Sequence, residues 1–362
     1  MTANRGRVLM AMSGGVDSSV AAILLLEQGY ELVGITMKVW DYSQSGGTKQ
    51  ETGCCSLDAI NDARLLAVKL GFPHYVVDLR EPFKEHIISG FIDEYMNGRT
   101  PNPCVLCNSF IKWDALLKKA DQLNCDFIAT GHYANIRKEN NRYLLARGID
   151  PKKDQSYMLW MLSQQNLART ILPLGNYTKH DTRLIAEKYG FLFLTEKRES
   201  FEICFIPDND YRAFLTRNVK NIENVAGEGP FLNSDDQVVG YHKGYPFYTI
   251  GQRKGLNIAM GEPVYVYKID PESNSIYVGT KDKLLSDELW LKNVNTIKYD
   301  KIPEDVQLTI KIRYHDKGSS CKVVMDNGRL KVVFDHAVSA ITPGQSAVLY
   351  EGDDVVAGGI ID

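Results

Sequence analysis

AMSGGVDSS, residues 11–19, is the stretch that decides the fold of the amino-terminal half of the chain. A short apolar run leads into it, and an apolar helical pattern over residues 16–26 follows it. A strand, a glycine turn and a helix in this order form a cradle for phosphate, because Gly14 and Gly15 let backbone N–H groups approach an anion closely. The serines add hydroxyl donors, and the positive end of the helix dipole points at the same place. The stretch therefore predicts a phosphate-binding loop.

The loop differs from a Walker A loop, because no Gly-Lys-Ser/Thr follows its glycines. Asp17 stands one residue into the expected helix instead, and its carboxylate would repel phosphates unless a cation such as Mg²⁺ lay between them. The pattern SGGxDS resembles the pyrophosphatase loop of the ATP pyrophosphatase superfamily, whose members adenylate a substrate oxygen and release pyrophosphate. An ordinary Gly-Ser turn is the alternative, but glycines, hydroxyls and acid at the required offsets favour the phosphate site.

Strand and helix patterns alternate through the first two hundred residues. Short apolar segments predict strands at 7–12, 31–39, 74–78 and 126–130. The segments between them predict helices at 17–28, 56–70, 81–96 and 109–123. This alternation predicts an α/β fold with a doubly wound parallel sheet, in which ligands bind at the carboxyl ends of the strands, where the phosphate loop lies.

The pattern changes after about residue 220. Helical signals at 156–164, 179–189 and 210–218 give way to short segments rich in Val, Tyr and Ile. These predict strands at 238–241, 263–269, 275–280, 307–313, 320–325, 329–334, 346–351 and 355–361. Asp326-Asn327-Gly328 is a strong hairpin signal. We therefore expect a nucleotide-binding catalytic domain over 1–215, a small linking α+β domain over 216–285 and a β-barrel over 286–362.

Composition is ordinary for a soluble protein. The 362 residues are 44% hydrophobic and 24% charged, with a formal net charge of −3, so a bulk basic signature for nucleic acid is absent. No run approaches the roughly 20 apolar residues of a membrane helix, and no secretory signal is visible. Seven cysteines, an odd number, argue against a disulfide scaffold. We expect a cytoplasmic location.

Three cysteines stand out from the rest. GRTPNPCVLCN, residues 98–108, reads as a proline-punctuated loop that presents Cys104 and Cys107, and Cys204 lies in a short apolar segment before a turn. Small core residues are one interpretation, which suits Cys125 and Cys321 better. Zinc would require four ligands, whereas a three-cysteine iron–sulfur cluster would not. The third interpretation is a sulfur relay, in which one thiol carries a persulfide and another resolves it.

Eight motifs occur in an order that identifies a family. The motifs are SGGVDSS (13–19), GCCSLDAINDAR (53–64), TPNPCVLCN (100–108), TGHYA (130–134), KDQSYML (153–159), EICFI (202–206), YTIGQRKGL (248–256) and TPGQSAVLYEGD (342–353). Together they resemble the tRNA-specific 2-thiouridylase family over nearly the whole chain.

The resemblance implies a reaction. Its substrate is the wobble uridine of certain tRNAs, whose C2 oxygen is adenylated by ATP with Mg²⁺ and then replaced by sulfur, with release of AMP and pyrophosphate. Cys204 matches the family's persulfide carrier, and Cys107 matches the partner that forms a disulfide with Cys204 as sulfur is released. A persulfide donor protein, either a cysteine desulfurase or a relay carrier, is implied as a second partner. A flipped uridine is expected.

Other positions carry over one by one from the resemblance. The catalytic positions are Asp17, Cys107 and Cys204, and the nucleotide-binding positions are Ala11, Met12, Ser13, Gly14, Gly15, Val16, Asp17, Ser18, Met37 and Gly131. The tRNA-binding positions are Asn102, Pro103, Cys104, His132, Lys153, Asp154, Gln155, Arg313, Tyr314 and Gln345. Each of these tRNA-binding assignments has a purely structural alternative: a core histidine at His132, a solvated loop at 153–155, and a surface arginine beside a core tyrosine at 313–314.

Two departures from the family keep alternatives open. Many members have Asp where Cys104 stands, so a [4Fe-4S] enzyme with Cys104, Cys107 and Cys204 as ligands is a rival interpretation. Glu202 adds negative charge near Cys204, which disfavours a thiolate there. Another ATP pyrophosphatase, such as an amidating ligase, would need no cysteines. A non-catalytic nucleotide-binding module would release no pyrophosphate.

Overall fold

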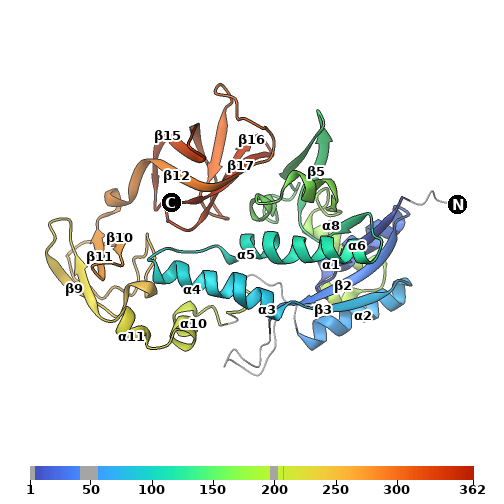
Figure 1. The fold of residues 1–362 in the computed structure, drawn as a ribbon, viewed down its shortest axis with the longest axis horizontal. Coiled ribbons are helices and arrows are strands. Elements are labelled where there is room, and N and C mark those ends of the chain that lie inside the picture. Colours follow the sequence, from blue (N-terminus) through green and yellow to red (C-terminus); the bar gives the residue numbers. More distant parts are fainter. Residues whose placement is uncertain (1–4, 41–55, 196–202, 207) are drawn as a thin grey trace. The chain divides into compact units, whose positions relative to one another are not determined.

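A computed structural model describes residues 5–40, 56–195, 203–206 and 208–362 of the chain. The chain forms two compact units (Figure 1). The first unit contains residues 1–87, 104–209 and 353–355, and the second contains 88–103, 210–352 and 356–362. Within the described ranges, no helix is long and apolar enough to cross a membrane. The domain boundaries expected at 215 and 285 stay a prediction.

The first unit is built on a parallel sheet, as the alternating pattern predicts. Its strand order is β3-β2-β1-β4-β7, with the phosphate loop following the central strand. The strands are β1 (Arg7–Ala11), β2 (Glu31–Lys38), β3 (His74–Asp78), β4 (Phe127–Ala129) and β7 (Thr170–Ile171). Because all pairings are parallel, the carboxyl ends of β1, β2 and β4 meet at one edge.

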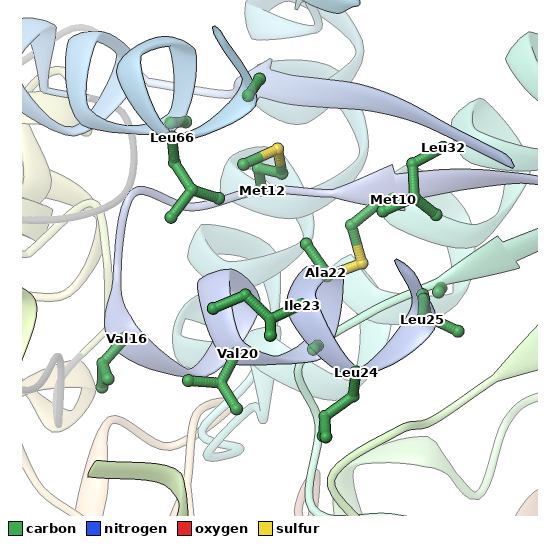
Figure 2. Close-up of a cluster of buried hydrophobic side chains, with 14 of the residues drawn as sticks. Met10, Met12, Val16, Val20, Ala22, Ile23, Leu24, Leu25, Leu32 and Leu66 are labelled. Carbon is green, nitrogen blue, oxygen red and sulfur yellow. The ribbon is translucent and has the colours of Figure 1, made fainter. Parts of the chain in front are cut away.

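Helix α1 (Val16–Glu27) packs its apolar residues against this sheet. Figure 2 shows Met10 of β1 reaching toward Ala22 of α1, within a cluster of buried side chains that also includes Leu66 of α2 (Leu57–Leu70). Ser56 caps α2 by accepting a hydrogen bond from the Ala59 N–H at 3.1 Å. Gly71, at φ 81°, ends α2 as expected, because its left-handed conformation suits glycine.

The segment that carries Cys104 and Cys107 is helical, which corrects the expected loop. A helical run begins at Pro103 and continues through α5 (Pro103–Leu106), the π-helix η3 (Cys107–Trp113) and α6 (Asp114–Gln122). Proline suits the first helical position, because its φ is already helical and its missing N–H would have no intrahelical partner there. Pro103 therefore marks the start of a helix, and the helix that we expected to begin at residue 109 begins six residues earlier.

The remaining elements of the first unit lie outside this parallel sheet. A β-hairpin of β5 (Ala134–Glu139) and β6 (Arg142–Arg147) was not expected from the sequence. Its turn residues, Asn140 and Asn141, both have positive φ, a conformation that asparagine tolerates. The described helices are α3 (Arg80–Phe83), η2 (Lys84–Ile88), η4 (Ser156–Leu159), α7 (Gln164–Ala168), α8 (Lys179–Lys188) and α9 (Leu192–Thr195).

The second unit holds a small sheet and a barrel. The sheet has the order β10-β11-β8-β9 and is accompanied by α4 (Ser89–Met96), α10 (Tyr211–Asn218) and α11 (Ile222–Val225). Its strands are β8 (Gly229–Leu232), β9 (Val238–His242), β10 (Tyr265–Asp270) and β11 (Ser275–Gly279). Two short 3-10 helices, η5 (Tyr245–Phe247) and η6 (Lys281–Leu284), complete it.

The barrel closes because β12 pairs with both β15 and β17. Its strand order is β12-β15-β14-β13-β16-β17, and its side chains form a separate buried cluster. The strands are β12 (Leu285–Thr296), β13 (Leu308–Lys311), β14 (Ser319–Asp326), β15 (Arg329–Ser339), β16 (Ser346–Glu351) and β17 (Asp354–Ile361). Asn327 and Gly328 have φ of 47° and 78°, the geometry of the predicted hairpin turn. The predicted parallel α/β sheet and β-barrel are both confirmed.

Candidate functional site

The start of α1 is shaped to receive an anion. Gly15 caps the helix, and glycine has no side chain to accept from the first-turn N–H groups. Gly14 has φ of 69°, and a Cβ there would lie 2.2 Å from the Ala59 carbonyl oxygen. Only glycine fits this contact, which packs the loop directly on the first turn of α2. The backbone therefore presents amides and the helix dipole to one point.

The serines of the loop hold its shape. Ser18 Oγ accepts a hydrogen bond from the Ser13 N–H at 3.1 Å and donates to the Gly15 carbonyl oxygen at 3.1 Å. Ser19 Oγ also donates to the Gly15 carbonyl oxygen, at 2.9 Å. Ser18 and Ser19 are buried, whereas Ser13 is exposed. The buried hydroxyls thus act on the loop itself, and Ser13 is the serine that faces solvent.

Asp17 has a cationic partner inside the protein. Lys179 Nζ, from the first residue of α8, lies 2.7 and 2.8 Å from the two carboxylate oxygens, and its side chain is only 9% exposed. The Tyr133 hydroxyl donates to Asp17 Oδ1 at 2.6 Å. The sequence predicted a role for Asp17 but not for Lys179, because 162 residues separate the two in the chain. The requirement for a cation beside Asp17 was the signal that could have prompted a search for it.

The predicted nucleotide positions lie around the carboxyl edge of the sheet. Ala11 ends β1 and Met12 follows it directly, and Met37 lies near the end of the neighbouring β2. Gly131 follows β4, and a Cβ at this position would lie 2.8 Å from the Ser18 backbone nitrogen. The β4 loop therefore packs on the first turn of α1, beside the phosphate loop.

His132 is half-buried, between Thr130 and Trp113. Its Nδ1 lies 2.7 Å from Thr130 Oγ1, and its ring centroid lies 5.6 Å from that of Trp113. Burial lowers the pKa of His132 to about 3, and the ammonium of Lys112 contributes in the same direction. The imidazole therefore carries no charge near neutral pH, so any contact with tRNA would be a neutral hydrogen bond or a ring contact.

The two thiols of the CxxC motif differ in exposure. Cys104 is exposed and Cys107 is buried. Four and eight residues after Cys104 on the same helical run come Asn108 and Lys112, and Lys112 Nζ donates to Asn108 Oδ1 at 2.8 Å. Asn108 Nδ2 in turn donates to the Met158 carbonyl oxygen at 3.0 Å, which orients the amide. The Lys112 ammonium favours the thiolate of Cys104 electrostatically, which acts to lower its pKa.

Cys204 is held by its neighbour Phe205. Cys204 is half-buried, whereas Phe205 is fully buried, with its ring centroid 5.6 Å from that of Phe83 and 6.2 Å from that of Trp40. Phe83 ends α3, and α3 contacts η3, which begins at Cys107. The segment that bears Cys204 therefore packs on an element that also touches the CxxC helix. Glu202 lies outside the described residues.

The described part of the chain offers no preassembled metal site. No three His, Cys, Asp or Glu side chains within it lie close enough together to hold a metal ion. Cys104, Cys107 and Cys204 are all described, so they do not form a ready-made set of cluster ligands. Burial raises the pKa of Cys125 and that of Cys321, the latter to about 12.

Internal hydrogen bonds hold the turn at residues 153–155, which was predicted to bind tRNA. Asp154 is buried, and its Oδ1 accepts from the N–H groups of Gly148 and Ser156 at 3.2 and 3.0 Å. Gln155 Oε1 accepts from the Tyr133 N–H at 3.0 Å. These two side chains therefore hold the turn and the loop beside His132 in place. Lys153 is half-buried at the same turn.

The other predicted tRNA positions belong to the second unit. Gln345 Nε2 donates to the Thr100 and Pro101 carbonyl oxygens at 3.0 and 3.2 Å, and so fixes the backbone directly before Asn102 and Pro103. Pro103 is buried and Asn102 is half-buried. Elsewhere in this unit, Arg313 is exposed, and the half-buried Tyr314 stacks edge-on against His315. All these positions stay predictions.

Three family models match consecutive parts of the chain. A tRNA methyl transferase HUP domain matches residues 6–208, a tRNA methyl transferase PRC-barrel domain matches 214–280, and an aminomethyltransferase β-barrel domain matches 286–361. The first model alone covers more than half of the chain.

Curated relatives match nearly the whole chain. The tRNA-specific 2-thiouridylase MnmA of Amoebophilus asiaticus is 58% identical over 99% of this chain and 95% of its own length. Proteins of the same name from Cytophaga hutchinsonii and Salinibacter ruber are 54% and 56% identical over 99% of this chain, and the matches cover 97% and 94% of those proteins.

Proposed function

The chain belongs to the tRNA-specific 2-thiouridylase family, and from this premise we propose that it is an ATP-dependent sulfurtransferase that converts the wobble uridine of tRNA to 2-thiouridine. The structural observation that carries the proposal is the start of α1, where a glycine cap leaves the first-turn amides directed at one point beside Asp17 and Lys179. A cytoplasmic location fits this activity.

The reaction needs a leaving group that uridine lacks. A carbonyl oxygen at C2 is a poor leaving group, so it is first joined to AMP from ATP, and AMP then departs as sulfur attacks C2. The amides of the phosphate loop would hold the phosphates of ATP, and the Lys179 ammonium would offset charge that develops as pyrophosphate leaves. Cys204 would carry the sulfur as a persulfide, delivered by a donor protein.

Magnesium fits this site through a single carboxylate. Mg²⁺ is commonly held by one or two carboxylates together with substrate phosphates, and Asp17 can be that carboxylate, since its side chain is 35% exposed. When bound, the ion would screen the phosphate charges. Lys179 already neutralises Asp17 in its absence, so the protein keeps the acid in position before nucleotide and metal arrive.

Two matched domain descriptions name methyl transfer, whereas the relatives that match the whole chain are named for thiolation. The residues favour thiolation. The anion-binding loop supplies the ATP chemistry that activates an oxygen, and the cysteines of the same unit supply a route for sulfur.

The test uses anaerobically purified protein, ATP, Mg²⁺, a persulfide donor and unmodified tRNA with a wobble uridine. Mass spectrometry of digested tRNA should detect 2-thiouridine, and pyrophosphate should be released in equal amount. Cys204→Ser should abolish the product, whereas Cys321→Ala, which removes a buried cysteine of the barrel, should retain it.

Three other outcomes would each contradict the proposal. Pyrophosphate release without 2-thiouridine would indicate a different ATP pyrophosphatase, such as an amidating ligase. Nucleotide binding without pyrophosphate release, with tRNA present, would indicate a binding module. Activity that requires an iron-dependent visible absorption band would indicate the iron–sulfur mechanism.

A further inference from the structure

The CxxC motif has an asymmetry that the persulfide chemistry above leaves unexplained. Cys104 lies in the first turn of a helical run and is exposed, whereas Cys107 lies one turn later and is buried. The family resemblance assigns the resolving role to Cys107, but a persulfide on another segment would meet the exposed thiol first. The difference in exposure therefore favours Cys104 for the first attack.

We propose that Cys104 and Cys107 act in sequence as a dithiol, with Cys104 resolving the Cys204 persulfide and Cys107 then regenerating Cys204. This inference rests on the proposed function. The first step is attack by the Cys104 thiolate on Sγ of Cys204. The Sγ–S bond of the persulfide breaks, the Cys104–Cys204 disulfide forms, and the outer sulfur leaves as hydrosulfide. Hydrosulfide is then the nucleophile that displaces AMP from C2.

The second step resets the carrier. The Cys107 thiolate attacks Sγ of Cys104, the Cys104–Cys107 disulfide forms, and the Cys204 thiolate departs and takes up a proton. In total, two electrons pass from the dithiol to the outer sulfur of the persulfide, and two thiol protons go to Cys204 and to the released sulfide. An external dithiol reductant must then reduce the Cys104–Cys107 disulfide before the next cycle.

Helical spacing makes the internal disulfide feasible. Side chains three residues apart on a helix are neighbours, with Cβ atoms about 5–6 Å apart. A disulfide needs a Cβ separation of about 3.5–4.5 Å, so only a small local tightening of the first turn is required. A first turn also yields more easily than a helix interior, because its N–H groups are not held by intrahelical bonds.

The position of Cys204 supports the first step. Phe205 is buried against Phe83, whose helix α3 contacts η3, so the Cys204 segment and the CxxC helix share a neighbour. Lys112, fixed by Asn108, lies two turns from Cys104 on the same face of the helical run and favours its thiolate.

The experiment is a single turnover without added reductant. Wild type, Cys104→Ser, Cys107→Ser and the control Cys125→Ala, each loaded once with persulfide, are mixed with ATP, Mg²⁺ and tRNA. The 2-thiouridine formed and the disulfide-linked peptides left are then measured by mass spectrometry. Wild type should give one equivalent of product and the Cys104–Cys107 disulfide. Cys107→Ser should also give product but stop at the Cys104–Cys204 disulfide, and Cys104→Ser should give none.

The opposite pattern would overturn the inference while leaving the proposed function intact. If Cys107 resolves the persulfide directly, Cys104→Ser gives a full turnover with a Cys107–Cys204 disulfide, and Cys107→Ser gives none. If wild type forms no 2-thiouridine, the proposed function fails and the inference falls with it. The Cys125→Ala control should behave as wild type, because Cys125 is buried beside Leu123, at the end of α6.

Discussion

Two helices of the first unit begin in opposite ways. At the start of α8, Thr178 and Asp181 form a reciprocal capping box, and Asp150 Oδ2 accepts from the Lys179 N–H at 3.0 Å. At the start of α1, Gly15 offers no side chain to the first-turn amides. Asp17, the first acidic residue of α1, forms an ion pair with Lys179 instead of capping its own helix. One helix start is therefore closed by its own side chains, and the other is left for a ligand.

The comparison teaches that a helix start becomes a binding site when its capping group is withheld. A helix dipole and first-turn amides occur in both helices, but in α8 hydroxyl and carboxylate oxygens already satisfy several of these donors. Helix α8 also contributes to the site at the start of α1, because its first residue, Lys179, supplies the ammonium beside Asp17. A structural helix end and a functional one are thus linked by one ion pair.

The largest expected effect comes from Gly14→Ala, which breaks the open helix start. A Cβ at this position would clash with the Ala59 backbone, and the alanine would have to adopt a left-handed φ. We therefore expect the free energy of unfolding to fall by about 3 kcal/mol or more and ATP binding to be lost. Gly71→Ala is the control, since it has similar φ but nothing within 4 Å, and should cost only about 1–2 kcal/mol. Urea unfolding and calorimetry measure both. Equal losses would show that backbone conformation alone explains the first variant.

Lys179→Met severs the link between the two helices. Removing one partner of this partly buried pair should cost about 1–3 kcal/mol of unfolding free energy and should weaken ATP binding. Asp17→Asn and the double variant complete a double-mutant cycle, read by urea unfolding. The double variant should be less destabilised than the sum of the single ones. Strict additivity would contradict the coupling.

Thr178→Ala opens the closed helix start. Loss of a capping hydroxyl should cost about 1 kcal/mol of stability, measured by urea unfolding, without a change in the dissociation constant for ATP. The pair Thr178→Ala and Lys179→Met therefore separates the two roles of adjacent residues. A weaker ATP affinity in Thr178→Ala would mean that the cap itself shapes the phosphate site.

His132→Gln tests the loop beside the open start and has its smallest effect at neutral pH. Because the pKa of His132 is about 3 in the folded protein and near 6.5 when unfolded, the unfolded state binds a proton between these values and the folded state does not. This histidine thus lowers stability as pH falls below 6.5. Urea unfolding at pH 7.5 and 5.5 should show a smaller acid-induced loss in the variant. An equal loss would mean that His132 titrates alike in both states.

Much of the fold followed from local sequence signals. Ser56 and Gly71 bound α2 as predicted, and the Asn327-Gly328 turn joins the predicted hairpin. These signals worked because each depends on the conformational preference of one or two residues. The β5–β6 hairpin was not predicted, because its turn is Asn140-Asn141, which is a weaker hairpin signal than Asn-Gly, and because its strands carry several charged residues.

The site could be predicted only where it is continuous in sequence. The phosphate loop is one nonapeptide, so its shape follows from its own glycines. Lys179 could not be found in that way, because only the packing of α8 against α1 brings it to Asp17. The difference in exposure between Cys104 and Cys107 also depends on packing, as well as on a helix start hidden within a proline-rich segment.

The π-helix η3 has a consequence for how chains of this kind can vary in length. A π-turn accommodates one residue more than an α-turn, and each residue of an α-helix corresponds to a rotation of about 100°. Deleting one residue within Cys107–Trp113 would return the segment to α-helical winding and rotate Cys104 away from the face it shares with Lys112. We therefore expect homologous sequences to vary the side chains between the CxxC motif and Trp113 while keeping their number constant.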